Sequence, residues 1–292
     1  MGQERMSGKE RTLMSIRHEE PDRVPLNIWM FREDVQSRVI EQYGSLDRFY
    51  EELHIDVFMA ITPPPNRQNQ EFLEEQMTMQ LEEITGSDFM DPDDPVVYQD
   101  VKELVAKYGA DKCVLAHVWG VLEGAYSFLG VQETLTQFAL WEPPMGALFQ
   151  KLCDWSAHVA RNVVELGIDV LHISGDAGSN NAMLVSPKAW RERIAPLDGS
   201  IVSAGRERGM PCSLHSCGYF RPILDDLIEM GIQMVHPLQQ SAGMDLADVK
   251  KNWGDRLTIH GGLELRHYLP HASEEELVAH VRENVLTCKP GG

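Results

Sequence analysis

The residues best suited to chemistry lie in the segment SLHSCG, where His215 and Cys217 are separated by one residue. Alternate residues of a strand point to the same side, with Cα atoms about 6.6 Å apart at about 3.3 Å per residue. An imidazole and a thiolate so placed can bind one zinc ion, with Zn–N near about 2.0–2.1 Å and Zn–S near about 2.3 Å. Zinc would keep Cys217 as a thiolate and leave room for a third ligand and a substrate. The alternative is a polar turn after a buried strand, because an H-x-C pair also arises by chance.

Other polar residues follow predicted strands in the same way. Asp176 ends the run DVLHISGD and could bind a metal, transfer a proton or accept a hydrogen bond from a substrate. Its alternative role is to cap the turn that follows, because DAGSNN is typical loop chemistry. His236 and His260 each stand where a strand meets a loop, and we expect structural histidines with satisfied hydrogen bonds there rather than ligands. Glu264 lies shortly after the last strand, and we expect a solvated loop carboxylate.

The elements that must position these residues alternate between strands and helices. Seven short apolar runs are predicted as strands, over residues 24–28, 55–60, 113–119, 169–176, 211–218, 232–237 and 256–262. Helices are predicted over residues 8–18, 122–130, 131–140, 145–166, 187–208, 221–230, 245–252 and 273–286, the last with a capping box at Ser273 and Glu276. This alternation implies parallel strands and an α/β fold, a (β/α)8 TIM barrel whose active site lies at the C-terminal ends of the strands.

The predicted organisation is a single (β/α) barrel domain over residues 1–292. A proline- and glutamate-rich excursion at about 62–100 interrupts it, packs over one end of the domain and could include a hairpin. The sequence stops at residues 289–292, where an eighth strand is expected to begin. We therefore expect a barrel truncated before strand eight, from a longer protein.

Composition excludes several classes of protein. The formal net charge of −19 argues against nucleic acid or a membrane surface as a partner. No run of 18 apolar residues and no apolar signal-peptide core is present, so we expect a cytoplasmic enzyme. The five cysteines are too scattered for a disulfide framework. Cys113, Cys153 and Cys212 are predicted to be core residues, and Arg17, Asp22 and Arg23 to form structural ion pairs. G-x-G-x-x-G, Walker and G-x-S-x-G motifs are absent from the sequence.

The ordered motifs resemble the uroporphyrinogen decarboxylase-like family, in particular its branch of corrinoid-dependent zinc methyltransferases. The resemblance spans nearly the whole chain and rests on HEEPDRVPLNIW, GVLEGAYSFLG, HISGDAGSNNAMLVSPKAWRERIAP, SLHSCGYFRPILDDLIEMGIQMVHPLQ, SAGMDLADVKKNWGDRLTIHGGLE and the final KPGG. It implies a (β/α)8 barrel. True uroporphyrinogen decarboxylases carry R-Q-A-G-R-Y after the first strand, where this chain has WMFREDVQSR, which argues against a porphyrinogen substrate.

The resemblance also implies a ligand set. The methyltransferase branch binds zinc through an H-x-C motif after strand five, which corresponds to His215 and Cys217. A further cysteine lies near strand eight in those enzymes, and Cys288 falls a few residues before that position. The third ligand is therefore open among Cys288, Glu264, Gln239 and Asp176.

The implied function is a zinc-dependent methyltransferase. Zinc at His215 and Cys217 would act as a Lewis acid toward a thiol, or toward a methoxyl or methylamine substrate, while Asp176 orients the substrate or transfers a proton. The methyl group would move to or from a corrinoid on a partner protein, because the sequence contains no recognisable cobalamin-binding module. The alternatives are a metal-free decarboxylase or lyase and a non-catalytic barrel that binds a corrinoid protein.

Overall fold

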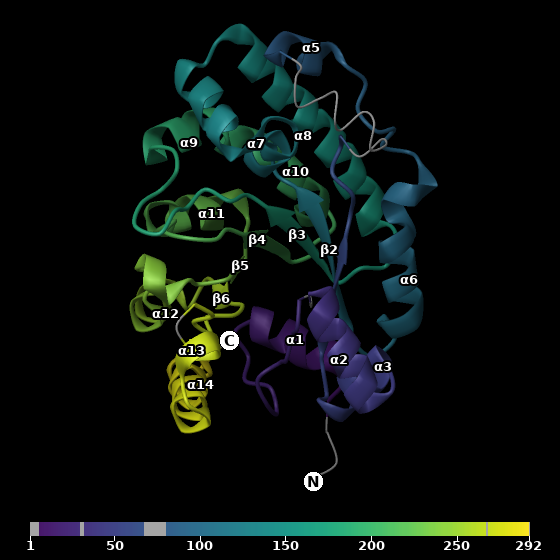
Figure 1. The fold of residues 1–292 in the computed structure, drawn as a ribbon, viewed down its shortest axis with the longest axis vertical. Coiled ribbons are helices and arrows are strands. Elements are labelled where there is room, and N and C mark those ends of the chain that lie inside the picture. Colours follow the sequence, from purple (N-terminus) through teal and green to yellow (C-terminus); the bar gives the residue numbers. More distant parts are fainter. Residues whose placement is uncertain (1–5, 30–31, 67–79, 267, 292) are drawn as a thin grey trace.

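The computed structural model describes residues 6–29, 32–66, 80–266 and 268–291. Its centre is a parallel sheet in which the strands are adjacent in chain order (Figure 1). The strands are β1 (Val57–Ile61), β2 (Cys113–Trp119), β3 (Val170–Ser174), β4 (Cys212–His215), β5 (Met234–His236) and β6 (Thr258–Ile259). Parallel neighbours in sequence order, each joined by helical crossovers, are the arrangement of a (β/α) barrel.

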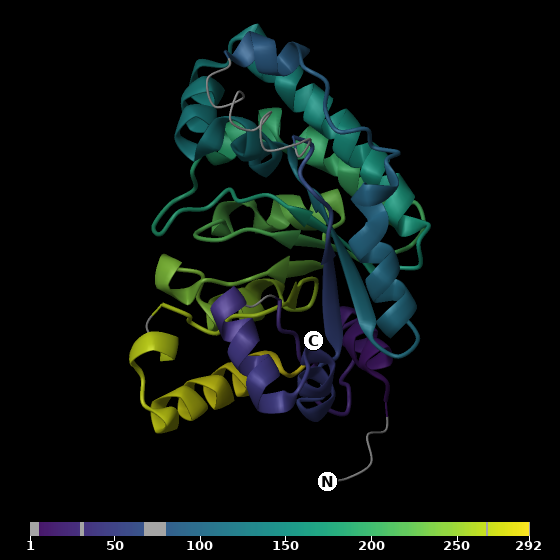
Figure 2. The same ribbon diagram turned by 45° about the vertical axis from the view of Figure 1, so that its right-hand side comes forward.

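Helices surround this sheet and account for most of the crossovers. They are α1 (Gly8–Ile16), α2 (Glu33–Tyr43), α3 (Leu46–Glu52), α5 (Leu81–Gly86), α6 (Gln99–Tyr108), α7 (Val121–Leu140), α8 (Pro143–Val164), α9 (Pro187–Arg193), α10 (Ala195–Arg206), α11 (Leu224–Met230), α12 (Leu246–Trp253), α13 (Tyr268–His271) and α14 (Glu274–Cys288). Short 3₁₀ turns cover Pro95–Tyr98, Arg221–Ile223 and Gln240–Ala242. Figure 2 shows the strands crossing the middle of the molecule, with helices along their outer side.

Six of the seven predicted strands are present, and the prediction over residues 24–28 is wrong in its extent. That segment makes only one parallel bridge, from Asn27 to Val57 of β1. Pro25 has no N–H to donate to a ladder, and Leu26 is 44% exposed. The bridge nevertheless places this segment beside β1, where a preceding barrel strand would lie.

Two helix predictions differ from the structure for identifiable reasons. The helix predicted over residues 187–208 is two helices, divided at Ile194, because Pro196 lacks the N–H that a continuous helix would use. The helices predicted over residues 122–130 and 131–140 form one helix, α7. The predicted break between them is a kink at Gly130, where φ is 70°. The capping box of Ser273 and Glu276 is confirmed at the start of α14.

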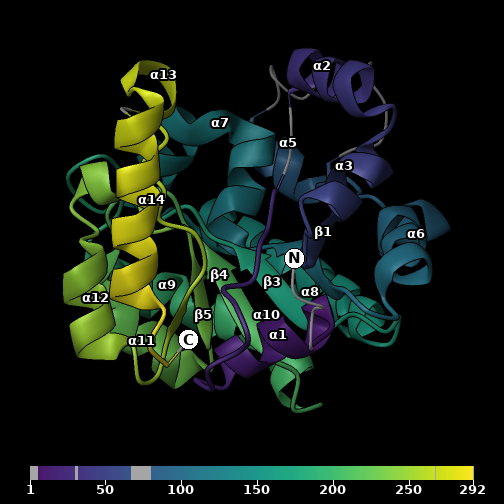
Figure 3. The ribbon, with the colours of Figure 1, turned by 90° about the horizontal axis from the view of Figure 1, so that it is seen from below.

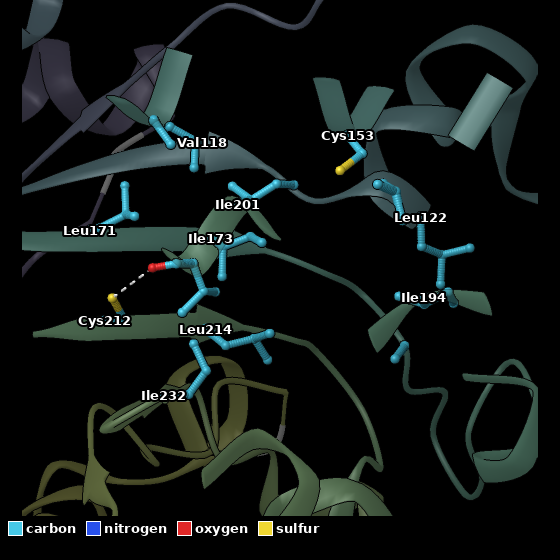
Figure 4. Packing of buried hydrophobic residues seen from close by; sticks show 14 of the residues in the cluster. Val118, Leu122, Cys153, Leu171, Ile173, Ile194, Ile201, Cys212, Leu214 and Ile232 are labelled. Atoms are coloured by element: carbon cyan, nitrogen blue, oxygen red, sulfur yellow. Dashed lines mark hydrogen bonds between the residues drawn. The ribbon is translucent and has the colours of Figure 1, made fainter. Parts of the chain in front are cut away.

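The main apolar core lies between the sheet and the surrounding helices. Leu171 and Ile173 of β3 and Leu214 of β4 point outward and pack with Ile201 of α10 (Figure 4). Cys212 joins them, with its Sγ 3.7 Å from the Val202 carbonyl oxygen. Cys113, Cys153 and Cys212 are all buried, which confirms their prediction as core residues.

The opposite face of the strands lines the barrel interior. At the N-terminal ends of the strands it is apolar: Val57, Met59, Leu115 and Val170 form a small cluster that Ile16 of α1 covers. The last residues of the chain lie beside this end, where the carbonyl of Gly291 is 3.0 Å from Nδ1 of His18 (Figure 3). Side chains nearer the C-terminal ends of the strands are polar, and the candidate site begins there.

The predicted excursion contains α5 and the 3₁₀ turn Pro95–Tyr98. It packs against α8, where Trp155 donates a hydrogen bond to the Met90 carbonyl (2.6 Å) and Lys151 donates one to the Thr85 carbonyl (3.1 Å). The described residues between 62 and 100 contain no strand, and residues 67–79 lie outside the described part, so the hairpin stays a prediction. Among the described helices, none is both long and apolar enough to cross a membrane.

Candidate metal site at the ends of the strands

Histidines line the interior of the barrel on five neighbouring strand positions. They are His117 on β2, His172 on β3, His215 on β4, His236 on β5 and His260 directly after β6. The strand register pairs His117 with His172 and His215 with His236. Paired residues of neighbouring strands share a face, so these imidazoles point into the same space. His215 and His236 stand one layer closer to the C-terminal ends of the strands than His117 and His172.

The side chains of Asp176, His215 and Cys217 converge at these C-terminal ends. Nε2 of His215 is 3.4 Å from Oδ1 of Asp176 and 3.6 Å from Sγ of Cys217. One ligand atom from each of the three lies within 4.8 Å of the other two. His215 is buried and Cys217 is exposed, so the group opens toward solvent. The structure thus brings together three residues singled out from the sequence.

Two loops that pack tightly against each other hold this group. The backbone N–H of Cys217 donates to Oδ1 of Asp176 (2.7 Å), and that of Ala177 donates to Oγ of Ser216 (3.1 Å). The glycines at the crossing are required by contact: a Cβ on Gly178 would lie 2.4 Å from the carbonyl oxygen of Cys217. Gly218 has φ of +74°, in the left-handed region that favours glycine. The loops after β3 and β4 therefore act as one unit.

The electrostatics of the group are those of a partly buried ion pair. Burial alone would lower the pKa of His215, but hydrogen bonds to Asp176 and Cys217 outweigh it and raise the pKa to about 9. Burial opposes ionisation of Asp176, yet the hydrogen bond and charge of His215 hold the pKa of that carboxyl below its usual value. Without a metal, His215 is therefore a protonated cation beside the Asp176 carboxylate at neutral pH.

Tyr126 and Glu123 of α7, which were not singled out from the sequence, complete the surroundings of Asp176. The Asp176 carbonyl accepts a hydrogen bond from the hydroxyl of Tyr126 (3.1 Å), and its backbone N–H points to Oε2 of Glu123 (3.4 Å). Burial and the nearby charge of Asp176 raise the pKa of Glu123. The two residues lie one turn apart at the start of α7, directly after β2. Their position at the C-terminal end of a predicted strand could have indicated that they border the site.

Zinc fits the donor set and its spacing. A tetrahedral zinc ion with ordinary bond lengths separates a nitrogen from an oxygen ligand by about 3.4 Å, and a nitrogen from a sulfur ligand by about 3.6 Å. The separations around Nε2 of His215 are 3.4 and 3.6 Å. Imidazole, thiolate and carboxylate are all zinc ligands. Nδ1 of His215 faces Nδ1 of His236 at 3.0 Å, the kind of outer contact that orients a metal-binding imidazole.

The other candidates for a third ligand lie apart from this group. Gln239 accepts a hydrogen bond through Oε1 from the N–H of Gly218 (3.0 Å), so it supports the loop that carries Cys217. The expectation of a solvated carboxylate at Glu264 is wrong: the side chain is buried, and its carboxylate accepts from the N–H groups of Ser241 (2.9 Å) and Arg266 (2.8 Å). Cys288 ends α14 and packs at the edge of the core. Within the described ranges, neither Glu264 nor Cys288 belongs to a group of three side chains spaced for a metal ion.

His236 pairs with His215 through Nδ1, whereas the expectation of satisfied hydrogen bonds is wrong for His260, whose Nδ1 has no partner among the described residues. Nε2 of His260 is 3.2 Å from Oδ1 of Asn27, so the segment after β6 meets the segment before β1. The ring of Trp29 stands edge-on to His215 and His236, with centroids 4.7 Å away in both cases. His117, His172 and Trp29 were not singled out from the sequence, although each strand from β2 to β5 carries a histidine.

Comparison with known proteins agrees with this architecture. The family model described as uroporphyrinogen decarboxylase (URO-D) matches residues 59–291. A solved structure of a methyltransferase from Methanosarcina mazei superposes with a TM-score of 0.64, covering 97% of this chain and 90% of the other, at 17% sequence identity. At that identity the likeness establishes the shared fold. No curated protein matches the sequence.

Proposed function

Since this chain belongs to the uroporphyrinogen decarboxylase (URO-D) family, we propose that it is the zinc-dependent methyltransferase type of that fold. In this proposal the enzyme moves a methyl group between a small substrate or thiol and a corrinoid carried by a partner protein. The name of the structural neighbour, a methyltransferase, supports the reaction class.

The observation that carries the proposal is the convergence of Asp176, His215 and Cys217 at the C-terminal ends of β3 and β4. Active sites of (β/α) barrels lie at this end. Three protein ligands with one open position are the usual composition of a catalytic zinc site. Asp176 takes the place of the third ligand here, in preference to Cys288, Glu264 and Gln239, because its Oδ1 is 3.4 Å from Nε2 of His215.

Each residue has a distinct role in this site. Zinc bound here would supply Lewis acidity toward a thiol, a methoxyl oxygen or a methylamine. His215 and Cys217 hold the ion, and Asp176 joins them while its Oδ1 fixes the backbone of Cys217. Tyr126 and Glu123 hold the backbone around Asp176. In this proposal Nδ1 of His215 keeps its proton and donates a hydrogen bond to Nδ1 of His236, which leaves Nε2 free to bind the ion.

The corrinoid would be delivered by another protein in this proposal. The described parts of the chain form one sheet with its helices. The net charge of −19 favours a partner that presents a basic face, because complementary charge accelerates encounter.

One observation favours a second candidate function. Without a metal, the protonated His215 and ionised Asp176 form a partly buried acid–base pair, which suits a metal-free decarboxylase or lyase. That reading agrees with the activity in the family's name. It requires that Cys217 be dispensable, because a thiol has no role in the pair.

Zinc content and methyl transfer together distinguish the two candidates. We expect about one tightly bound zinc per wild-type chain, bound much more weakly by Cys217→Ser and lost in His215→Ala, together with transfer between methylcobalamin and a thiol in the wild type only. Cys288→Ser is the matched control, and it should retain both zinc and activity. Full activity of Cys217→Ser, with no zinc in any variant, would instead support the metal-free lyase.

A further inference from the structure

A second group of potential metal ligands lies deeper in the barrel than Asp176 and Cys217. His172, His215 and His236 each place one ring nitrogen within 4.8 Å of a ring nitrogen of the other two. All three side chains are buried, and they come from three neighbouring strands, β3, β4 and β5. Their positions are therefore fixed by the sheet rather than by loops.

His172 gives an independent reason to expect a ligand in this space. Its ring is fully buried, and Nδ1 lies 2.9 Å from Oγ of Ser213. Its Nε2 has no hydrogen-bond partner among the residues that the structure describes. Buried polar atoms are nearly always paired, so an orphaned nitrogen inside a histidine cluster marks a place where another atom binds.

We propose that His172, His215 and His236 form a second metal site, which binds a divalent transition-metal ion through imidazole nitrogens alone. Three histidines with an open fourth position are an established arrangement for zinc, and imidazole also suits copper, iron and nickel. Nδ1 of His172 is already paired with Oγ of Ser213, so Nε2 is the ring nitrogen left for the ion. The proposal concerns binding only and does not depend on methyl transfer.

His215 belongs to both groups through different atoms. Its Nε2 faces Asp176 and Cys217, whereas its Nδ1 faces His236 at 3.0 Å. A neutral imidazole has one free lone pair, so it binds one ion unless it loses its second ring proton. The outer group offers a thiolate and a carboxylate, and these negative charges favour the first ion there. The inner site is therefore a weak second site in the wild type and the main site when the outer ligands are removed.

Cobalt(II) binding to the double variant Cys217→Ser, Asp176→Asn tests this inner site. We expect one cobalt per chain, with ligand-field absorption but without the thiolate-to-cobalt charge-transfer band that reports the outer site in the wild type. Adding His172→Asn, which keeps an amide near Ser213 but removes Nε2, should weaken binding by more than about tenfold. His117→Asn, a buried histidine of the same layer outside the group, is the matched control and should leave cobalt affinity unchanged.

Two results would overturn the inner site. One is a folded double variant that binds no cobalt, and the other is unchanged affinity after His172→Asn. Thermal unfolding checks that each variant is folded. If His172→Asn does not fold, His236→Gln removes another of the three proposed ligands instead. Absence of the charge-transfer band in the wild type would count against the outer site alone. A failure of the proposed function can therefore be told apart from a failure of the inner site.

Discussion

The two ends of the sheet treat buried polar groups in opposite ways. At the N-terminal ends, Asp56 is inaccessible to solvent and binds Nη1 of Arg11 (2.6 Å) and Nη1 of Arg23 (2.5 Å). The N–H of Leu26 donates to the same carboxylate (2.8 Å). At the C-terminal ends, His172 and His260 each leave a ring nitrogen without a hydrogen-bond partner in the described structure. The N-terminal ends of the strands, where the Asp56 carboxylate is fully paired, are the saturated end of the sheet. The C-terminal ends, where ring nitrogens are unpaired, are the open end.

This difference separates stability from function. A buried charge is tolerated when every lone pair is matched, and the network around Asp56 meets that condition. Unpaired groups weaken a fold unless a ligand or water satisfies them. Those of Trp29 and His172 lie near His215, where barrels place their chemistry. The expected structural pairing of Asp22 and Arg23 is confirmed at the saturated end, with Asp22 bound to Arg11.

The largest expected effect lies at the saturated end. Asp56→Ala removes the buried carboxylate that Arg11 and Arg23 share and leaves Arg11 with Asp22 as its remaining carboxylate, so it should lower the free energy of unfolding by about 3–5 kcal/mol. Urea denaturation measures this loss. Arg17→Ala is the control, because its ion pair with Glu19 is exposed and should contribute roughly 0–1 kcal/mol. Similar losses in both variants would show that the two ends do not differ as argued.

The pH dependence of stability gives the next largest effect. Asp198 is fully buried near the open end, and it accepts a hydrogen bond from the N–H of Val121 (2.9 Å) without a cation partner in the described residues. Burial raises the pKa of this carboxyl from 3.8 to about 7. A raised pKa means that the folded state prefers the protonated carboxyl. Its contribution to stability is therefore complete below pH about 4, declines as the pH rises, and is lost above pH about 7.

Asp198→Asn removes this titration, because the amide stays neutral and its oxygen can still accept from Val121. The variant should be more stable than the wild type at pH 8, by on the order of 2–4 kcal/mol, and the difference should vanish near pH 4. Unfolding free energies measured from pH 4 to pH 8 check the sign. A constant difference between the two proteins across that range would contradict the burial argument.

A smaller effect is expected where the two site loops cross. Gly178→Ala introduces a Cβ that would lie 2.4 Å from the Cys217 carbonyl oxygen, so the loops must separate. We expect zinc affinity to fall more than about tenfold, while stability falls by only about 1–3 kcal/mol. Gly146→Ala on α8, where a Cβ meets no atom within 4 Å, should leave zinc affinity unchanged. Equal zinc affinity in both variants would mean that the crossing does not position the site.

The sequence predicted the sheet well because strand formation here depends on local pattern. Residues 113–119 form β2 at the predicted bounds, and the C-terminal positions of β3 and β4 place Asp176 beside His215. The missing strand at residues 24–28 shows the limit of that pattern. An apolar run predicts burial, whereas the ladder also needs N–H donors that Pro25 cannot supply.

Only those residues of the candidate site that lie at or near a strand end in the sequence could be predicted. His215 and Cys217 share a strand end, so their spacing was informative. His172 and Glu123 enter the site through sheet register and helix position, which depend on contacts across more than 40 residues of sequence. The sequence could not decide among the candidates for a third ligand for the same reason. Asp176 meets Cys217 because the Gly178 and Gly218 loops cross, and no local sequence pattern predicts that crossing.

Gln239→Ala has the smallest expected effect and resolves the last alternative among the ligands. Its Oε1 accepts one hydrogen bond from Gly218, next to Cys217, so its removal should cost about 1 kcal/mol, or roughly fivefold in zinc affinity. A direct ligand would cost far more, because its loss removes a bond to the ion itself. Zinc titration against a competing chelator separates these cases: a loss beyond about 100-fold would make Gln239 a ligand and leave Asp176 as its support. A loss near fivefold would place Gln239 with the loops and leave Asp176, His215 and Cys217 as the proposed ligands.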